Sequence, residues 1–85
     1  MRKRNKEVNH IGLFSLMGKR VLLMCANYFY AGKLTGFTDT EVLLEDPYIV
    51  YETGEWDDKK WAEAKPLGRP IFVNRDFIES FFEGK

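Results

Sequence analysis

The chain has 85 residues, a length that fits one small domain, and its 13 Lys and Arg residues balance 13 Asp and Glu residues. Zero net charge argues against a simple polybasic nucleic-acid binder, and a single cysteine excludes an internal disulfide. No apolar run approaches the roughly 20 residues of a membrane span, and no signal-type apolar segment follows the basic N-terminus.

The N-terminal segment predicts a basic tail followed by a short helix. Residues 1–7 form the tail. Val8, Ile11, Phe14 and Met17 then recur every three residues, which is typical of the apolar stripe of a helix. Gly18 fits the position after the end of that helix.

Three strands follow, over residues 19–27, 29–38 and 41–53, joined by short turns. Gly32 and Gly36 lie inside the second strand, where glycines allow a strand to curve or another backbone to approach. Pro47 removes a hydrogen-bond donor from the third strand, so a bulge or an edge position is expected there.

The remainder predicts a long connection and two short strands. Residues 54–70 fit either a helical turn around residues 57–64 or a wide hairpin. Trp56 and Trp61 in this connection either pin it onto the sheet or offer rings to bases or to a partner. Residues 71–82 divide into two short strands around residues 74–76.

One helix followed by about five strands excludes a doubly wound α/β fold and favours a mainly β domain. The expected architecture is a small, strongly bent antiparallel sheet or partly open barrel over residues 1–85. A chain this short buries only about 60% of its unfolded surface, so it needs a further source of stability. With no disulfide and no zinc ligand set, we expect self-association. A single unpaired thiol fits the reducing cytoplasm, which is the expected location.

The segment from Gly18 to Asp46, GKRVLLMCANYFYAGKLTGFTDTEVLLED, resembles the first sequence motif of the Sm and Sm-like (Lsm, Hfq) proteins. IFVNRDFIESF, which begins at Ile71, is similar to their second motif. The residues that match the first motif in order are Tyr30, Gly32, Leu34, Gly36, Phe37, Leu44, Glu45 and Asp46.

The resemblance implies an Sm-like fold, with an N-terminal α-helix on a five-stranded, strongly bent antiparallel sheet. It also implies a closed homo-oligomeric ring, in which the fourth strand of one subunit pairs with the fifth strand of the next. Such rings bind single-stranded RNA around a pore, as RNA chaperones or ribonucleoprotein scaffolds. An open sheet has edges that favour a partner, which agrees independently with self-association.

The sequence departs from the family at the positions that hold a base. Asp39 stands near the Asp of the family, but Glu41 falls at the place of its Asn, and Thr40 offers no ring for stacking. Asn74 and Arg75 replace the usual Arg and Gly, which displaces the guanidinium by one residue. Because a stacking ring is missing and a carboxylate is added, we expect uridine readout to be weakened, changed or absent. The basic N-terminal third becomes the better candidate for RNA contact.

The candidate sites divide into two groups. The candidate RNA-binding residues are Thr38, Asp39, Thr40, Asn74, Arg75, Arg2, Lys3, Arg4 and Lys6. The candidate subunit-interface residues are Ile71, Phe72, Val73, Phe77, Ile78 and Phe81. Asp39 also fits a turn residue that bonds its own backbone, and residues 74–76 also fit an ordinary hairpin tip.

The expected partners are other copies of the chain and single-stranded RNA, with no membrane and no small-molecule substrate. No phosphate-binding loop, His pair or activated nucleophile is present, so we expect neither an enzyme nor a cofactor or metal. Cys25 lies in an apolar strand and is interpreted as a packing residue. The alternative is an Sm-fold structural or protein-interaction module that does not bind RNA.

Overall fold

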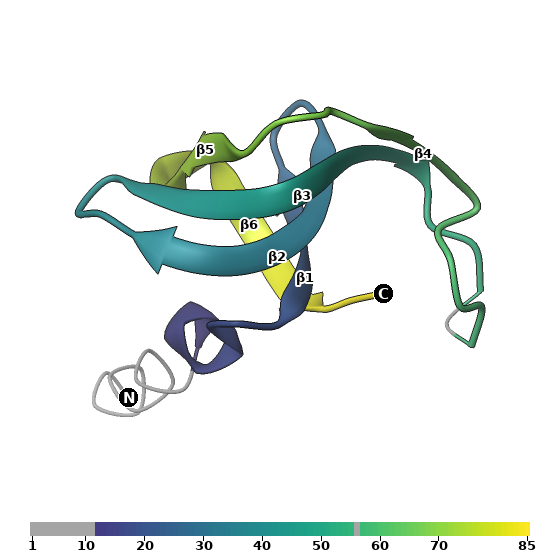
Figure 1. Ribbon diagram of the computed structural model, residues 1–85, viewed down its shortest axis with the longest axis horizontal. Coiled ribbons are helices and arrows are strands. Elements are labelled where there is room, and N and C mark those ends of the chain that lie inside the picture. Colours follow the sequence, from purple (N-terminus) through teal and green to yellow (C-terminus); the bar gives the residue numbers. More distant parts are fainter. Residues whose placement is uncertain (1–11, 56) are drawn as a thin grey trace.

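The computed structural model describes residues 12–55 and 57–85. These residues form one antiparallel sheet of six strands, as the mainly β prediction required (Figure 1). The strands are β1 (Arg20–Cys25), β2 (Phe29–Phe37), β3 (Glu41–Glu52), β4 (Glu63–Pro66), β5 (Ile71–Asn74) and β6 (Ile78–Glu83). Two 3-10 helices, η1 (Leu13–Leu16) and η2 (Arg75–Phe77), accompany them.

The strand order is β4-β3-β2-β1-β6, and β5 also pairs with β3. The long β3 strand carries two partners end to end along one edge: Glu41 to Leu44 pair with β5, and Tyr48 to Glu52 pair with β4. The expected count of five strands was therefore one too low. The additional strand, β4, lies in the 54–70 connection, where the wide hairpin and not the helical turn is correct.

The N-terminal helix was expected from the spacing of Val8, Ile11, Phe14 and Met17. Val8 and Ile11 lie outside the described residues, and the described part contains the 3-10 turn η1 in place of an α-helix. No side chain caps this turn at Gly12, and glycine is a poor helix former, so the segment gains its stability by packing. Gly18 follows the turn with φ of 85°, as expected of a residue after a helical end.

Two bulges bend the β2–β3 pair, and both involve the predicted positions. The register shifts between Ala31 and Lys33, opposite Asp46 and Pro47, and Asp46 has φ of 53°. A second shift lies between Leu34 and Gly36. Because extra residues in one strand increase local twist, β2 and β3 curve across the molecule (Figure 1).

The core lies on both faces of the curved sheet. Val21, Leu23, Leu34 and Leu44 belong to the larger cluster inside the curve. The smaller cluster on the other face contains Leu22, Ala31 and Val50, and Trp61 packs against it. Because successive residues of a strand point to opposite faces, β1 is apolar on both faces from Val21 to Cys25, and its residues 21–23 are fully buried.

Trp61 and Lys85 hold the β3–β4 connection against this second face. The ammonium of Lys85 donates to the carbonyl oxygens of Thr53, Glu55 and Lys60 at 3.0–3.1 Å. The same ammonium lies 4.8 Å from the centroid of the Trp61 ring. Trp61 therefore pins the connection onto the sheet, whereas Trp56 lies outside the described residues.

Candidate nucleic-acid and assembly sites

The two turns that carry the candidate RNA-binding residues meet in space. The turn of residues 38–40 joins β2 to β3, and Arg75 begins η2 after β5. The backbone N–H of Arg75 donates to the Thr40 carbonyl at 2.8 Å. Its Nη1 donates to the Thr38 carbonyl at 3.1 Å and to the Asp39 carbonyl at 3.5 Å. Main chain and side chain of Arg75 thus both bind the same turn.

We call the turns of residues 38–40 and 74–76 together the turn cluster. Two of its polar side chains accept hydrogen bonds from backbone N–H groups of their own turns. Thr38 Oγ1 accepts from the N–H groups of Thr40 and Glu41 at 3.2 and 2.9 Å. Asn74 Oδ1 accepts from the N–H of Asp76 at 2.9 Å and so caps η2. These two side chains therefore shape the turns that present the exposed Asp39 and the partly buried Arg75.

Two aromatic rings flank the guanidinium of Arg75. Its central carbon lies 5.8 Å from the Phe14 ring centroid and 5.7 Å from the Phe37 ring centroid. The rings contact each other, with centroids 4.2 Å apart and a tilt of 40°. Sequence reasoning placed Phe14 only in an apolar stripe and missed this position. No local pattern could have found it, because the cluster joins residues 14, 37 and 75.

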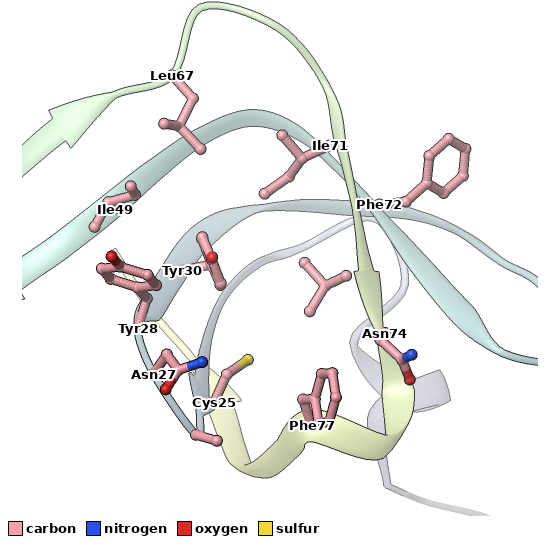
Figure 2. A pocket seen from close by; sticks show the side chains of 12 residues that line it. Cys25, Asn27, Tyr28, Tyr30, Ile49, Leu67, Ile71, Phe72, Asn74 and Phe77 are labelled. Atoms are coloured by element: carbon pink, nitrogen blue, oxygen red, sulfur yellow. The ribbon is translucent and has the colours of Figure 1, made fainter.

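An open apolar pocket of about 490 Å³ lies between β3, β5, η2 and the β1–β2 turn (Figure 2). Ile49, Leu67 and Ile71 lie on one side of it, and Cys25 and Phe77 lie on the opposite side. The other lining residues are Ala26, Asn27, Tyr28, Tyr30, Phe72, Val73 and Asn74. The pocket is therefore lined mainly by apolar and aromatic side chains.

Several aromatic side chains of this pocket are unusually exposed. Phe72 and Phe77 are 60% and 59% exposed, and Tyr28 is 51% exposed. Phe72 points outward from β5, away from the hollow (Figure 2). Clustered exposed apolar groups of this kind mark a surface that favours association.

Cys25 belongs to the pocket wall but not to a reactive site. Burial raises the pKa of its thiol, and the nearby Glu79 carboxylate raises it further. The thiol donates a weak hydrogen bond to the Leu23 carbonyl at 3.9 Å. A thiol with a raised pKa is protonated at neutral pH, which agrees with the interpretation of Cys25 as a packing residue. Burial likewise raises the pKa of the neighbouring Tyr30 hydroxyl.

The candidate interface residues do not share one environment. Phe72 and Phe77 are exposed, and Ile71 is partly buried at the pocket. Val73 is only 6% exposed and belongs to the core. Ile78 and Phe81 are partly buried and pack against the same core cluster.

The basic candidates Arg2, Lys3, Arg4 and Lys6 lie outside the described residues. Within residues 12–55 and 57–85, no three His, Cys, Asp or Glu side chains gather as a metal site requires. The same part of the chain contains no helix of the length and apolar character needed to cross a membrane.

Neither the comparison with protein-family models nor that with curated proteins finds a match to this sequence.

Proposed function

We propose that this chain is an Sm-like subunit that assembles into a closed homo-oligomeric ring and binds single-stranded RNA. The observation that carries the proposal is the meeting of the two motif turns at Arg75. This guanidinium donates to the Thr38 and Asp39 carbonyls, although its residue is separated from them by more than 30 positions in the sequence. The turns that the resemblance assigns to RNA thus form one cluster around the Arg75 guanidinium, which lies among the carboxylate residues Asp39 and Asp76 of the same two turns.

The sheet edges support assembly. Within the described sheet, β5 pairs only with β3 and β6 pairs only with β1, so each has one edge without a partner strand. Edge strands expose N–H and C=O groups that favour strand addition. β5 also carries the exposed Phe72 next to the apolar pocket. A head-to-tail contact between β5 and β6 of identical copies would satisfy both edges, and such contacts make rings when the rotation closes.

The charge of Arg75 supports RNA contact. Among the described residues Arg75 forms no ion pair, since the pairs there are Lys19–Glu83 and Arg20–Asp46. A guanidinium without an ion-pair partner, held by two carbonyls, is suited to donate hydrogen bonds to a phosphate. The further cations of the proposed RNA contact are Arg2, Lys3, Arg4 and Lys6.

Two measurements test the proposal. Multi-angle light scattering gives the absolute mass, for which we expect a multiple of 10.0 kDa with three or more subunits. Fluorescence anisotropy with labelled oligo-uridine and oligo-adenosine tests RNA, for which we expect binding at low salt that weakens as salt rises. A monomer would refute the ring, and failure of every oligonucleotide at low salt would refute RNA binding.

The second candidate function is a structural or protein-interaction module without RNA binding. The exposed Phe72 and Phe77 beside an open apolar pocket favour it, because such a surface binds a protein segment as readily as a second copy. A protein that stays bound after nuclease treatment and is lost on Phe77→Ser, with the mass unchanged, would support this function. Loss of all retained material on nuclease treatment would instead favour RNA.

A further inference from the structure

The Phe14 residue lies beside the turns of residues 38–40 and 74–76, with the Arg75 guanidinium over its ring, and is about half exposed. One side of the ring contacts Phe37, and yet 53% of the residue remains exposed. Its neighbours Leu13 and Leu16 in η1 pack against the core, so η1 is docked and Phe14 is held at a fixed place. The ring is therefore an exposed flat apolar surface on a positioned element.

The guanidinium beside this ring is also held in place. Arg75 Nη1 is bound by the carbonyls of Thr38 and Asp39, while its Nε and Nη2 donate to no group within residues 12–55 and 57–85. Because a guanidinium offers five N–H donors, several remain for a ligand. The nearby Asp39, Glu41 and Asp76 carboxylates form no ion pair with it in the described part of the chain.

The Phe14 ring and the Arg75 guanidinium lie 5.8 Å apart, so together they could bind the base and the phosphate of one nucleotide. A nucleobase stacks on an aromatic face whatever its sequence, and a phosphate accepts from free guanidinium donors. We propose that Phe14 stacks a base of single-stranded RNA while Arg75 Nε and Nη2 bind its phosphate. Phe14 thereby supplies the stacking surface that Thr40 cannot provide, and this inference depends on the proposed RNA function.

The central test compares three versions of the intact chain. Phe14→Leu keeps an apolar contact with Phe37 but removes the aromatic face, and Phe14→Trp keeps a ring. Tyr51→Leu is the matched control, because Tyr51 is 56% exposed on β3 and is not part of the turn cluster. The probe is fluorescein-labelled hexauridine at low salt, read by anisotropy.

We expect Phe14→Leu to weaken hexauridine binding by at least about fivefold, the lower bound for losing one stacked base. Phe14→Trp and Tyr51→Leu should bind within about twofold of the unsubstituted chain. A labelled abasic hexamer, which offers phosphates and no bases, should bind Phe14→Leu and the unsubstituted chain equally. Arg75→Gln should lower the affinity of the chain for the abasic hexamer and make that affinity depend less steeply on salt concentration.

Two failures are distinguishable. If the unsubstituted chain binds no oligonucleotide, both the proposed function and this inference are refuted. If the unsubstituted chain binds hexauridine and a folded Phe14→Leu variant binds it equally well, only the stacking role is refuted.

If circular dichroism shows that Phe14→Leu is unfolded, NMR of the unsubstituted chain tests the stacking role through the Phe14 ring-proton resonances. We expect these resonances to shift upfield when hexauridine is added and not when the abasic hexamer is added. Resonances that stay unchanged with hexauridine would overturn the inference.

Discussion

At the scale of single residues, Gly32 shows why a glycine stands in the middle of a strand. An added Cβ at this position would lie 3.1 Å from the Glu45 carbonyl oxygen and 3.3 Å from the Pro47 Cα. Those backbone atoms belong to the β3 bulge, so they cannot move away as a flexible side chain could. Gly36 differs, because its added Cβ would meet only the Leu43 side chain at 3.4–3.5 Å, an ordinary contact.

We therefore expect Gly32→Ala to reduce the free energy of unfolding by about 1–3 kcal/mol, the usual cost of overpacking. Gly36→Ala is the control and should change the stability by less than about 1 kcal/mol, because the alanine fits and restricts the unfolded chain. Urea unfolding followed by tryptophan fluorescence measures both. Equal midpoints for the two variants would show that the β3 bulge does not require Gly32.

The sequence predicted this bulge well and the turn cluster only in part. Gly32 and Pro47 are local signals, because the missing side chain of a glycine and the missing N–H donor of a proline each change the backbone at that same position. The meeting of Phe14, Phe37 and Arg75 depends on three distant segments, and no spacing along the chain encodes it. For the same reason the turns of residues 38–40 and 74–76 could be identified separately, but not their mutual hydrogen bonds.

At the scale of elements, the β3–β4 hairpin is the part that sequence patterns describe least. Its strand β4 has only four residues and alternates little, so periodicity did not distinguish it from a helical turn. The structure holds the hairpin through tertiary contacts of Lys85 and Trp61 instead of through local preference. Tertiary contacts thus override a weak local signal.

Replacing the Lys85 ammonium should loosen this hairpin. Lys85→Met keeps the length of the side chain but removes the donor to three carbonyl groups. We expect a loss of about 1.5–3 kcal/mol in the free energy of unfolding, the usual contribution of a hydrogen bond made by a charged group. Amide hydrogen exchange should accelerate in residues 53–62 more than in β1. Lys65→Met, on the exposed side of β4, is the matched control, and equal exchange in the two variants would contradict this role.

At the scale of the whole molecule, the core on the two faces of the sheet leaves one apolar region around β5 exposed to solvent. The apolar pocket opens beside β5, which pairs only with β3 within the described sheet, and the Phe72 side chain of β5 points into solvent. A side chain that is 60% exposed contributes little to the fold of one copy. Its contribution is expected to appear when a second copy covers it.

Phe72→Glu should therefore disrupt the proposed assembly without unfolding the chain. A carboxylate buried at a contact between copies costs several kcal/mol when it has no partner, which is enough to favour the monomer. Light scattering should give a mass near 10.0 kDa for this variant, with an unchanged β-type circular dichroism spectrum. Tyr51→Glu, at a similarly exposed aromatic residue on β3, should keep the assembled mass. If Phe72→Glu also keeps that mass, the contact lies elsewhere.

The short run from Ile71 to Phe77 contains both the exposed Phe72 and the anchored Arg75. The two lie three positions apart on β5 and η2, and Arg75 clamps that run to the β2–β3 turn. Binding that restricts the motion of this run at Arg75 lowers the entropic cost of ordering it at Phe72, and the reverse also holds. In the proposed ring, subunit association and nucleotide binding should therefore be thermodynamically linked. The linkage must be reciprocal: an oligonucleotide would strengthen subunit association by the same factor by which association strengthens oligonucleotide binding.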